Sequence, residues 1–584
     1  MNEDNNKKIR ARALVIGCVF SFLFMTIAAR SVYLHVLKGP ELAKKAKSQY
    51  TSYKIASGKR GTIYDINSQE LATSTETTSV GAFPRKINNK KQVARKLAKI
   101  LGLKRRTVEK KLSTNKPFVW IKRKVSPKLV ASLKTLEITG LEYIGENKRA
   151  YPNRSLAAQL IGFTGTDERG LEGLEYKYNQ ELAGADDEVL IIKDALGRGF
   201  HTAETQLNRF NGNDITLTID KRIQFIAESY LKSTAEEYEA RYGTAVVMNP
   251  NDGSILAIAQ YPNINPNNYN SYDKSLWRNR AVTDPFEPGS TLKIFLAAAA
   301  LESGICTPDS IFFCENGKYR IGSKNVRDTH PEDWLSLKQI IKLSSNIGAV
   351  KISETIGREV LYKALTDFGF GQKTKIDCPG ETKGILSHYS KWSALDAGAI
   401  SFGQGVSVSA VQLLSAVSII ANGGNYVQPH ILNKVTSPEG RVIREFKKPS
   451  QKRIISAETA GKLKKIMASV TKKGGTGVNA ALQKYTVCGK TGTAQKITDG
   501  TSYSEDKYTA SFVGFAPLKN PEIAVLVVLD EPLVNYYGGT VAAPAFRRIV
   551  HDTLNYMNVP PEINDNTGNI LVAQRSKRKK SETF

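Results

Sequence analysis

FEPGSTLKIFLAAAALE, residues Phe286–Glu302, places a serine and a lysine three positions apart at the start of an apolar helix. Three residues make nearly one helical turn, so the side chains of Ser290 and Lys293 are expected on one face. The turns that follow are apolar, so we expect the helix to be buried, where a lysine is costly unless it is paired or neutral. Desolvation lowers the pKa of such a lysine and suits Lys293 to act as the base for the Ser290 hydroxyl.

The Ser-x-x-Lys spacing is a weak signal by itself, because the chain holds six further copies. Three lie in basic stretches, two in polar loops and one inside an amphipathic helix, so none has an apolar helix starting at the lysine. These copies are Ser113/Lys116, Ser229/Lys232, Ser271/Lys274, Ser469/Lys472, Ser504/Lys507 and Ser576/Lys579. Only the copy at Ser290 has the setting of a catalytic pair.

A second stretch, LSSNIGAVKIS, puts Ser344 and Asn346 two positions apart just before another apolar helix. Serine and asparagine are common N-caps, and the stretch alone is more typical of helix capping than of chemistry. Whether this stretch has a catalytic role depends on which residues the fold places beside Ser344 and Asn346.

A third stretch, YTVCGKTGTAQK, puts Lys490, Thr491, Gly492 and Thr493 after a short run typical of a strand. Gly-Lys-Thr also occurs in phosphate-binding loops, but the glycine required five residues before Gly489 is a lysine here. A second glycine pattern, GTGVNA at residues 475–480, lacks the preceding strand of a dinucleotide fingerprint. Both nucleotide-binding interpretations therefore fail.

The pattern of the chain predicts an α+β fold. We expect a strand over residues 215–220, a helix over 221–240, a hairpin around Asp252-Gly253, and two adjacent strands over 509–517 and 522–532. A helical middle between such strands is typical of one antiparallel sheet with helices packed against it. We divide the 584 residues into a cytoplasmic tail (1–12), an anchor (13–37), a mixed α/β pedestal (45–212), the α+β domain (213–557) and a polar basic tail (558–584) predicted to be disordered.

The amino terminus carries one candidate membrane span. Residues 1–12 are polar and basic, residues 13–29 carry no charge, and apolar residues continue past Arg30 to residue 37. About 20 apolar residues cross a bilayer, and basic residues ahead of the span place its start in the cytoplasm. A cleaved signal peptide is the alternative, but the run is long and lacks a clear A-x-A site. We predict an uncleaved single-pass anchor, with the rest of the chain outside the cytoplasm.

The net charge of +28 predicts an anionic partner. Export argues against nucleic acid and leaves a lipid surface or an anionic polymer such as a cell wall. The charge is concentrated in residues 85–154, with 21 Lys or Arg against four acids. This basic lobe is either a solvated face or a surface near anionic lipid or polymer. Cys306 and Cys314, the exported cysteines nearest in sequence, are either disulfide-bonded or free and buried.

The order Ser-x-x-Lys, Ser-x-Asn, Lys-Thr-Gly on an exported α+β domain resembles the signature of the serine β-lactamases and penicillin-binding proteins. RGTIYDINSQELA, Arg60–Ala72, resembles the segment that opens the exported part of class B penicillin-binding proteins, although Ile66 and Ser68 depart from the usual Arg and Gly. Residues 149–182 resemble their pedestal signature, and residues 400–424 resemble the helix after their Gly-Gln-Gly turn. The resemblance implies a serine β-lactamase-like transpeptidase domain.

The resemblance also implies roles for the first two motifs. Ser290 would attack the carbonyl of the penultimate D-Ala of a peptidoglycan stem peptide, and Lys293 would accept the serine proton. Ser344 would relay a proton to the leaving amine, and Asn346 would hold the substrate amide.

The third motif is expected to bind and orient the substrate. Lys490 is placed with the catalytic residues, and together with Thr491 it would orient the peptide carboxylate; Gly492 and Thr493 would line the site. The backbone N–H groups of Ser290 and Thr493 would form an oxyanion hole, worth about 3 kcal/mol per donor. An amine from a neighbouring stem peptide would then resolve the acyl-enzyme. No metal and no cofactor is implied.

Length and pedestal pattern favour the division-specific branch of the class B penicillin-binding proteins. This resemblance implies a location in the bacterial cytoplasmic membrane, with the catalytic domain on its outer side. The partners implied are stem peptides, β-lactams, a membrane-embedded SEDS-family glycosyltransferase and other divisome proteins. An elongation-type enzyme of the same class, a hydrolase (D,D-carboxypeptidase or β-lactamase) and a non-catalytic β-lactam sensor are the alternatives. The intact triplet argues against the sensor, and the pedestal argues against a small secreted lactamase.

Overall fold

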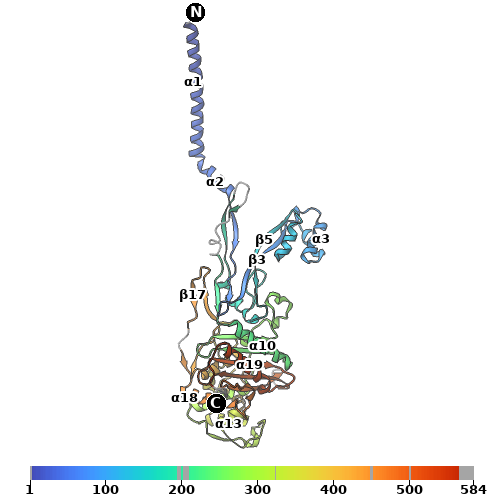
Figure 1. Cartoon of the computed structure of the whole chain (residues 1–584), viewed down its shortest axis with the longest axis vertical. Helices are drawn as coiled ribbons and strands as arrows, with labels where there is room; N and C mark the ends of the chain where they lie inside the picture. The colour runs from blue at the N-terminus through green and yellow to red at the C-terminus, as the bar shows by residue number, and fades with distance from the viewer. Residues whose placement is uncertain are drawn as a thin grey trace, which may run out of the picture. The chain divides into compact units, whose positions relative to one another are not determined.

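The computed structural model describes residues 3–193, 199–200, 210–322, 324–447, 451–498 and 502–563 (Figure 1). The chain splits into two compact units, residues 1–58 with 184–211 and residues 59–183 with 212–584. The boundaries predicted for the pedestal and the α+β domain stay predictions. Most of the carboxy-terminal tail lies outside the described residues.

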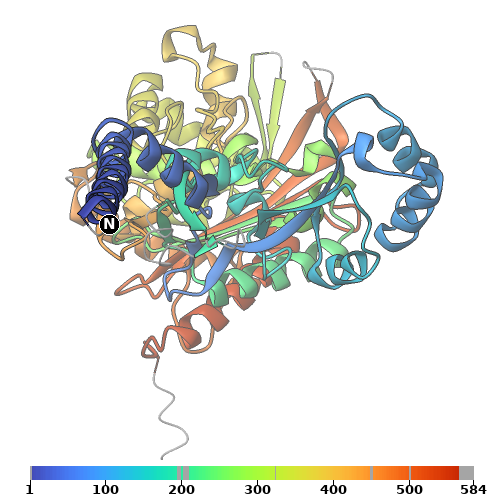
Figure 2. The same cartoon turned by 90° about the horizontal axis from the view of Figure 1, so that it is seen from above.

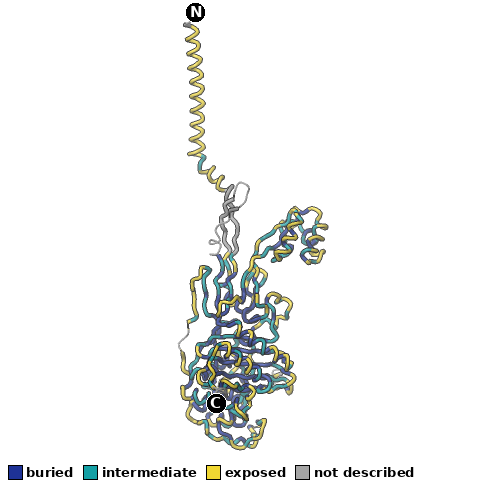
Figure 3. The backbone as a smooth tube through the Cα atoms, in the orientation of Figure 1, coloured by how far each residue is buried: buried dark blue, intermediate teal, exposed yellow. Residues whose placement is uncertain are grey.

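The first unit holds the predicted anchor. α1 (Glu3–Val32) and the following π-helical turn (Tyr33–Leu37) give one helix long and apolar enough to cross a membrane, over Asp4–Leu37. Its residues are exposed throughout, as the colouring of Figure 3 shows, so its apolar residues have no protein partner among the described residues. The predicted span (13–37) lies inside this helix. After α2 (Gly39–Tyr50), β1 (Thr51–Ser57) pairs antiparallel with β6 (Asp186–Lys193), which pairs with β7 (Gly199–Phe200).

The second unit begins with a sheet in the order β17-β16-β8-β2-β3-β4, with β5 also paired to β3, and its strands β8, β16 and β17 lie outside the range predicted for the pedestal. Helices α3, α4 and α5 cover its outer end and enclose a separate small core. The strands are β2 (Ile63–Tyr64), β3 (Glu70–Ala82), β4 (Val119–Val125), β5 (Leu141–Ala150), β8 (Asp214–Leu217), β16 (Leu432–Thr436) and β17 (Val442–Glu445), and the helices α3 (Lys90–Leu101), α4 (Arg105–Leu112) and α5 (Pro127–Lys134). The strand predicted at 215–220 is β8, which ends at Leu217, and it joins this sheet rather than the five-stranded sheet of the α+β domain.

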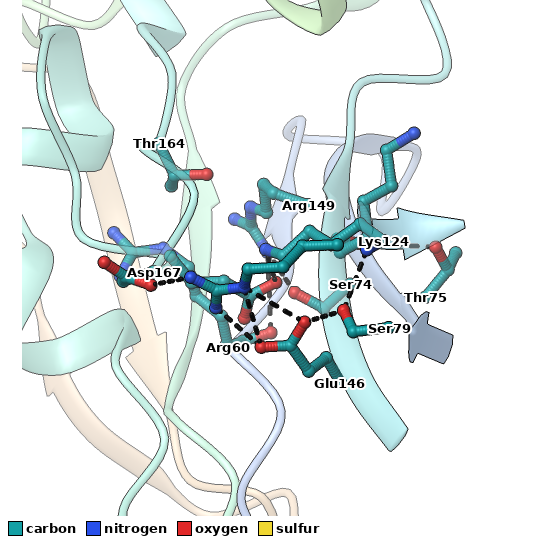
Figure 4. A network of polar contacts seen from close by, with 12 residues as sticks. Arg60, Ser74, Thr75, Ser79, Lys124, Glu146, Arg149, Thr164 and Asp167 are labelled. Carbon is teal, nitrogen blue, oxygen red and sulfur yellow. Dashed lines mark hydrogen bonds and ion pairs between the residues drawn. The ribbon is translucent and has the colours of Figure 1, made fainter. Parts of the chain in front are cut away.

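Two of the sequence signatures meet at one buried carboxylate. Glu175, in α7 (Gly173–Lys177), accepts hydrogen bonds from Arg60 Nε and Arg149 Nε, both at 2.6 Å. The side chain of Glu175 is 0 % exposed and those of both arginines 2 %. Figure 4 shows Arg60 and Arg149 in one view with Glu146. Glu146 accepts a hydrogen bond from Arg123 at 2.6 Å. The ion pairs at Glu175 therefore connect the segment that begins at Arg60 with the pedestal signature over residues 149–182.

Replacing Glu175 by alanine is expected to destabilise the second unit by about 3–5 kcal/mol, because two buried guanidinium groups lose the anion that they share. Glu181→Ala is the matched control: Glu181 pairs with Arg444 at 3.0 Å between partly exposed side chains, a pair worth about 1 kcal/mol or less. Thermal unfolding of the solubilised chain measures both. A midpoint for Glu175→Ala equal to that of the control would contradict the prediction.

The α+β domain is built on a five-stranded antiparallel sheet in the order β10-β9-β21-β20-β19. The hairpin predicted around Asp252-Gly253 is confirmed, since β9 pairs with β10, and the two strands predicted to be adjacent are confirmed by the pairing of β20 with β21. β19 lies at an edge of the sheet. The strands are β9 (Tyr242–Met248), β10 (Ile255–Tyr261), β19 (Cys488–Thr498), β20 (Ser502–Ala516) and β21 (Ile523–Asp530).

The sheet separates two hydrophobic cores. Along β9, Ala245 and Val247 face a core shared with α10 (Lys221–Glu237) and α19 (Gly538–Tyr556), while Val246 and Met248 face the other core. Burial on both faces explains the nearly unbroken apolar strands. Figure 2 shows α10 in green and α19 in red together along one side of the strands. α10 ends at residue 237 rather than 240, because Glu239 takes a positive φ of 50°.

The larger core holds the helices that carry the first two motifs, and α12 within it is buried at nine of its ten residues, as its sequence predicted. The helices that contribute to this core are α12 (Lys293–Glu302), α13 (Leu337–Leu343), α14 (Asn346–Ile356), α15 (Arg358–Asp367), α16 (Ala394–Ser401), α17 (Ala410–Ala421) and α18 (Ala457–Val470). The α+β fold class is confirmed. Cys306 and Cys314 are free, buried thiols in this core.

Candidate active site

Ser290 lies in a short 3₁₀ turn, Gly289–Leu292, that leads directly into α12. Gly289 has a φ of +53°, and a Cβ there would lie 2.8 Å from the carbonyl oxygen of Thr493, so glycine alone lets this turn approach β19. The Gly289 N–H also donates a hydrogen bond to the Gly403 carbonyl at 3.1 Å. The half-buried Ser290 side chain hydrogen-bonds to no described residue, so its hydroxyl is free for a substrate.

Lys293 is fully buried at the first turn of α12. Its Nζ donates to the Ser344 carbonyl at 2.6 Å and to Asn346 Oδ1 at 2.7 Å, and lies 3.4 Å from Ser344 Oγ. Burial lowers the pKa of Lys293 to about 7, with the negative charge of Asp328 acting in the opposite direction. An amine with this pKa can exchange a proton near neutral pH.

The capping role expected for the second motif belongs to its middle residue. Ser345 Oγ accepts from the Gly348 N–H at 2.8 Å and so caps α14. Ser344 ends α13 in the left-handed region, at a φ of 63°. The side chains of Ser344 and Asn346 are therefore not used as caps, and both contact Lys293.

Sequence reasoning missed Asp328, which follows β13 (Lys324–Arg327). Its carboxylate accepts from Ser345 Oγ and the Asn346 N–H, both at 2.5 Å, and from the Ile347 N–H at 3.1 Å. Asp328 thus anchors the start of α14, where an anion is favoured by the helix dipole. An acidic residue in a loop carries no sequence signal for this contact.

Lys490 is the second fully buried amine of the site. Its Nζ donates to Ser344 Oγ at 2.9 Å and to Thr491 Oγ1 at 3.3 Å. Burial and the nearby positive charge of Lys293 hold the pKa of Lys490 well below its usual range. The Ser344 hydroxyl therefore lies between two buried amines whose pKa values are both lowered.

The remaining residues of the third motif fix β19 against its neighbours. A Cβ on Gly492 would lie 2.3 Å from Ser511 Oγ and 2.9 Å from the Pro288 carbonyl, so only glycine fits there. Thr493 Oγ1 accepts from the Gly538 N–H at 3.1 Å, and Thr491 Oγ1 lies 3.0 Å from Thr476 Oγ1. The structure thus brings all three motifs together around Ser344 and the turn at Gly289.

Comparison with known proteins agrees with this geometry. Residues 243–551 match the penicillin binding protein transpeptidase domain, and residues 55–217 match the penicillin-binding protein dimerisation domain. The fold and the two domains place the chain among the penicillin-binding proteins. Its relatives then allow a finer assignment.

The chain is 35 % identical over 545 residues to the probable peptidoglycan D,D-transpeptidase PenA of Neisseria gonorrhoeae, covering 92 % of this chain and 91 % of that protein. It is 30 % identical over 558 residues to the peptidoglycan D,D-transpeptidase FtsI of Escherichia coli, covering 94 % and 92 %. Penicillin binding protein 3 of Mycobacterium tuberculosis, solved with aztreonam, aligns with a TM-score of 0.68 and 27 % identity over 87 % of this chain and 98 % of that one. The chain belongs to the class B penicillin-binding proteins and is a peptidoglycan D,D-transpeptidase of that type.

Proposed function

We propose that the chain cross-links peptidoglycan through an acyl-enzyme on Ser290. Ser290 Oγ attacks the carbonyl carbon of the penultimate D-Ala while its proton passes to neutral Nζ of Lys293. The C–N bond to the terminal D-Ala then breaks, and the leaving amine takes up a proton through the Ser344 hydroxyl. The observation that carries this proposal is Ser344 Oγ between two buried amines, 3.4 Å from Lys293 and 2.9 Å from Lys490.

The other motif residues bind the substrate in this proposal. Asn346 donates one Nδ2 hydrogen to the Arg327 carbonyl at 3.0 Å, which leaves the second hydrogen for the substrate amide. Lys490, Thr491 and Thr493 orient the peptide carboxylate beside Gly492. The N–H groups of Ser290 and Thr493 stabilise the oxyanion.

The acyl-enzyme is resolved by an amine of a neighbouring stem peptide rather than by water. The amine nitrogen bonds to the acyl carbon, the ester bond to Ser290 Oγ breaks, and the amine proton returns to Oγ through Lys293. A carboxypeptidase side activity follows when water replaces the amine. β-Lactams acylate the same serine and inhibit the enzyme.

We place this reaction in septal wall synthesis, as in FtsI-type enzymes; an elongation role is the second candidate. The span holds the catalytic domain on the outer side of the bacterial cytoplasmic membrane. There the span and pedestal dock a SEDS-family glycosyltransferase and other divisome proteins. A fluorescent fusion distinguishes the two roles: enrichment along the side wall rather than at the septum would contradict the septal assignment.

The chemistry is tested by partition between amine and water. The full chain in detergent is given a thioester donor that acylates serine enzymes, with and without a D-amino acid as acceptor. We expect the aminolysis product to form at the expense of hydrolysis as acceptor concentration rises. Acylation followed only by hydrolysis at every acceptor concentration would contradict the transpeptidase proposal in favour of the hydrolase.

A further inference from the structure

A cavity of about 790 Å³ lies beside the site in the α+β domain. Its walls include residues 494–497 of β19, the residues just before Ser290, and residues 241–244, which include the start of β9. β19 therefore carries Lys490 to Thr493 at the site and then runs directly along this cavity. A substrate that lies along β19 would therefore contact both the active site and this cavity.

The carboxylates that line this cavity are paired with cations, with one exception. Asp284 accepts from Arg280 at 2.5 Å, and Asp530 and Glu531 both accept from Lys496, at 2.9 and 2.6 Å. Glu287 forms no ion pair with any described residue. Among the described residues, Glu287 is thus the carboxylate of this lining that has no cation partner.

The hydrogen bonds of Glu287 leave one oxygen unused. Its Oε1 accepts from the Gly405 N–H at 2.9 Å and the Tyr503 hydroxyl at 3.2 Å. Its Oε2 is buried, and no described residue donates a hydrogen bond to it. Burial raises the pKa of this carboxyl above its usual value. A buried carboxylate oxygen without a donor is costly, so an incoming cation would find a strong partner here.

An edge strand such as β19 can pair with an extended peptide. In the proposed reaction the donor peptide ends at Thr491 and Thr493, and its preceding residues follow β19 toward Ile497. Each residue advances by about 3.3 Å, so the residue before the D-Ala pair comes beside Ala494 and the cavity. Because the acceptor is an amine of a neighbouring stem peptide, each stem peptide carries an amino side chain, and the donor brings one too.

We propose that Glu287 binds the ammonium side chain of the donor residue that precedes the terminal D-Ala pair. This inference rests on the proposed function and deepens it. Glu287 is then a specificity-determining residue that selects stem peptides with a diamino acid at this position. Oε2 takes the ammonium, while Oε1 keeps its two donors.

The test compares two thioester donors that end in D-Ala–D-thiolactate and differ only in the preceding residue, L-Lys or its Nε-acetyl form. For the full chain in detergent we expect kcat/KM about tenfold higher for the lysine donor, which corresponds to about 1.4 kcal/mol. In Glu287→Gln, which can still accept at Oε1, the ratio should fall to about one. Glu531→Gln removes a carboxylate that already has cation partners and should keep the preference.

Labelling by a fluorescent penicillin reports whether each variant is folded at the site. A wild-type ratio of about one overturns the inference, and this comparison needs no variant. An unchanged ratio in Glu287→Gln also overturns it, because the selectivity then comes from elsewhere. Failure of both thioesters to acylate a chain that penicillin labels contradicts the proposed function itself, and the inference falls with it.

Discussion

Ser290→Ala is expected to abolish covalent labelling of the chain by a fluorescent penicillin. Alanine lacks the oxygen that would form the ester, and the two amines of the site are fully buried, so we expect neither to take its place. The expected effect is complete loss of the label. Labelling is read on a denaturing gel, and mass spectrometry of the digest locates the modified peptide.

The matched control is Ser113→Ala, because Ser113 and Lys116 repeat the spacing in an exposed basic stretch. This variant should label normally. Ser290→Ala should also remain folded, since the hydroxyl it removes hydrogen-bonds to no described residue, and changes at such sites cost little. A label on any other peptide, or undiminished labelling of Ser290→Ala, would contradict the assignment.

The elements that local pattern determines could be predicted from the sequence. The Asp252-Gly253 turn between apolar runs predicted β9 and β10, which pair antiparallel in the structure. The apolar run after Lys293 predicted a buried helix, and the desolvation that lowers the pKa of Lys293 follows from that burial. Local sequence is sufficient to predict the hairpin and the buried helix, because each depends on residues that are close together in the chain.

The contacts that complete the site could not be predicted, because they join residues far apart in the sequence. Nothing in the LSSN stretch shows that Ser345 caps α14 while Ser344 takes a left-handed backbone. The anchoring of that stretch by Asp328 depends on tertiary packing, as does the meeting of Arg60 and Arg149 at Glu175. Motif order predicted which stretches meet, while side-chain geometry came only from the fold.

Lys293→Arg is expected to slow acylation by penicillin by about 10²–10⁴-fold, the range typical of losing a general base. An arginine stays charged at every accessible pH, so it cannot accept the Ser290 proton. The wild type should instead show a titration. Since the pKa of Lys293 is lowered to about 7, the amine is neutral above that pH, and the acylation rate should be flat there and fall about tenfold per unit below it.

Acylation rates from pH 5 to 9 measure both effects on the same chain. Lys351→Arg is the control: Lys351 pairs with Glu315 at 2.9 Å outside the triplet, so the exchange keeps its charge and should leave the rate and the pH profile unchanged. In Lys293→Arg the fall below pH 7 should disappear along with most of the rate, because the group that titrates is gone. A near-normal rate in that variant, or a wild-type profile that is flat down to pH 5, would mean that the base lies elsewhere. Lys490 would then be the first alternative, since its Nζ also reaches Ser344 Oγ, at 2.9 Å.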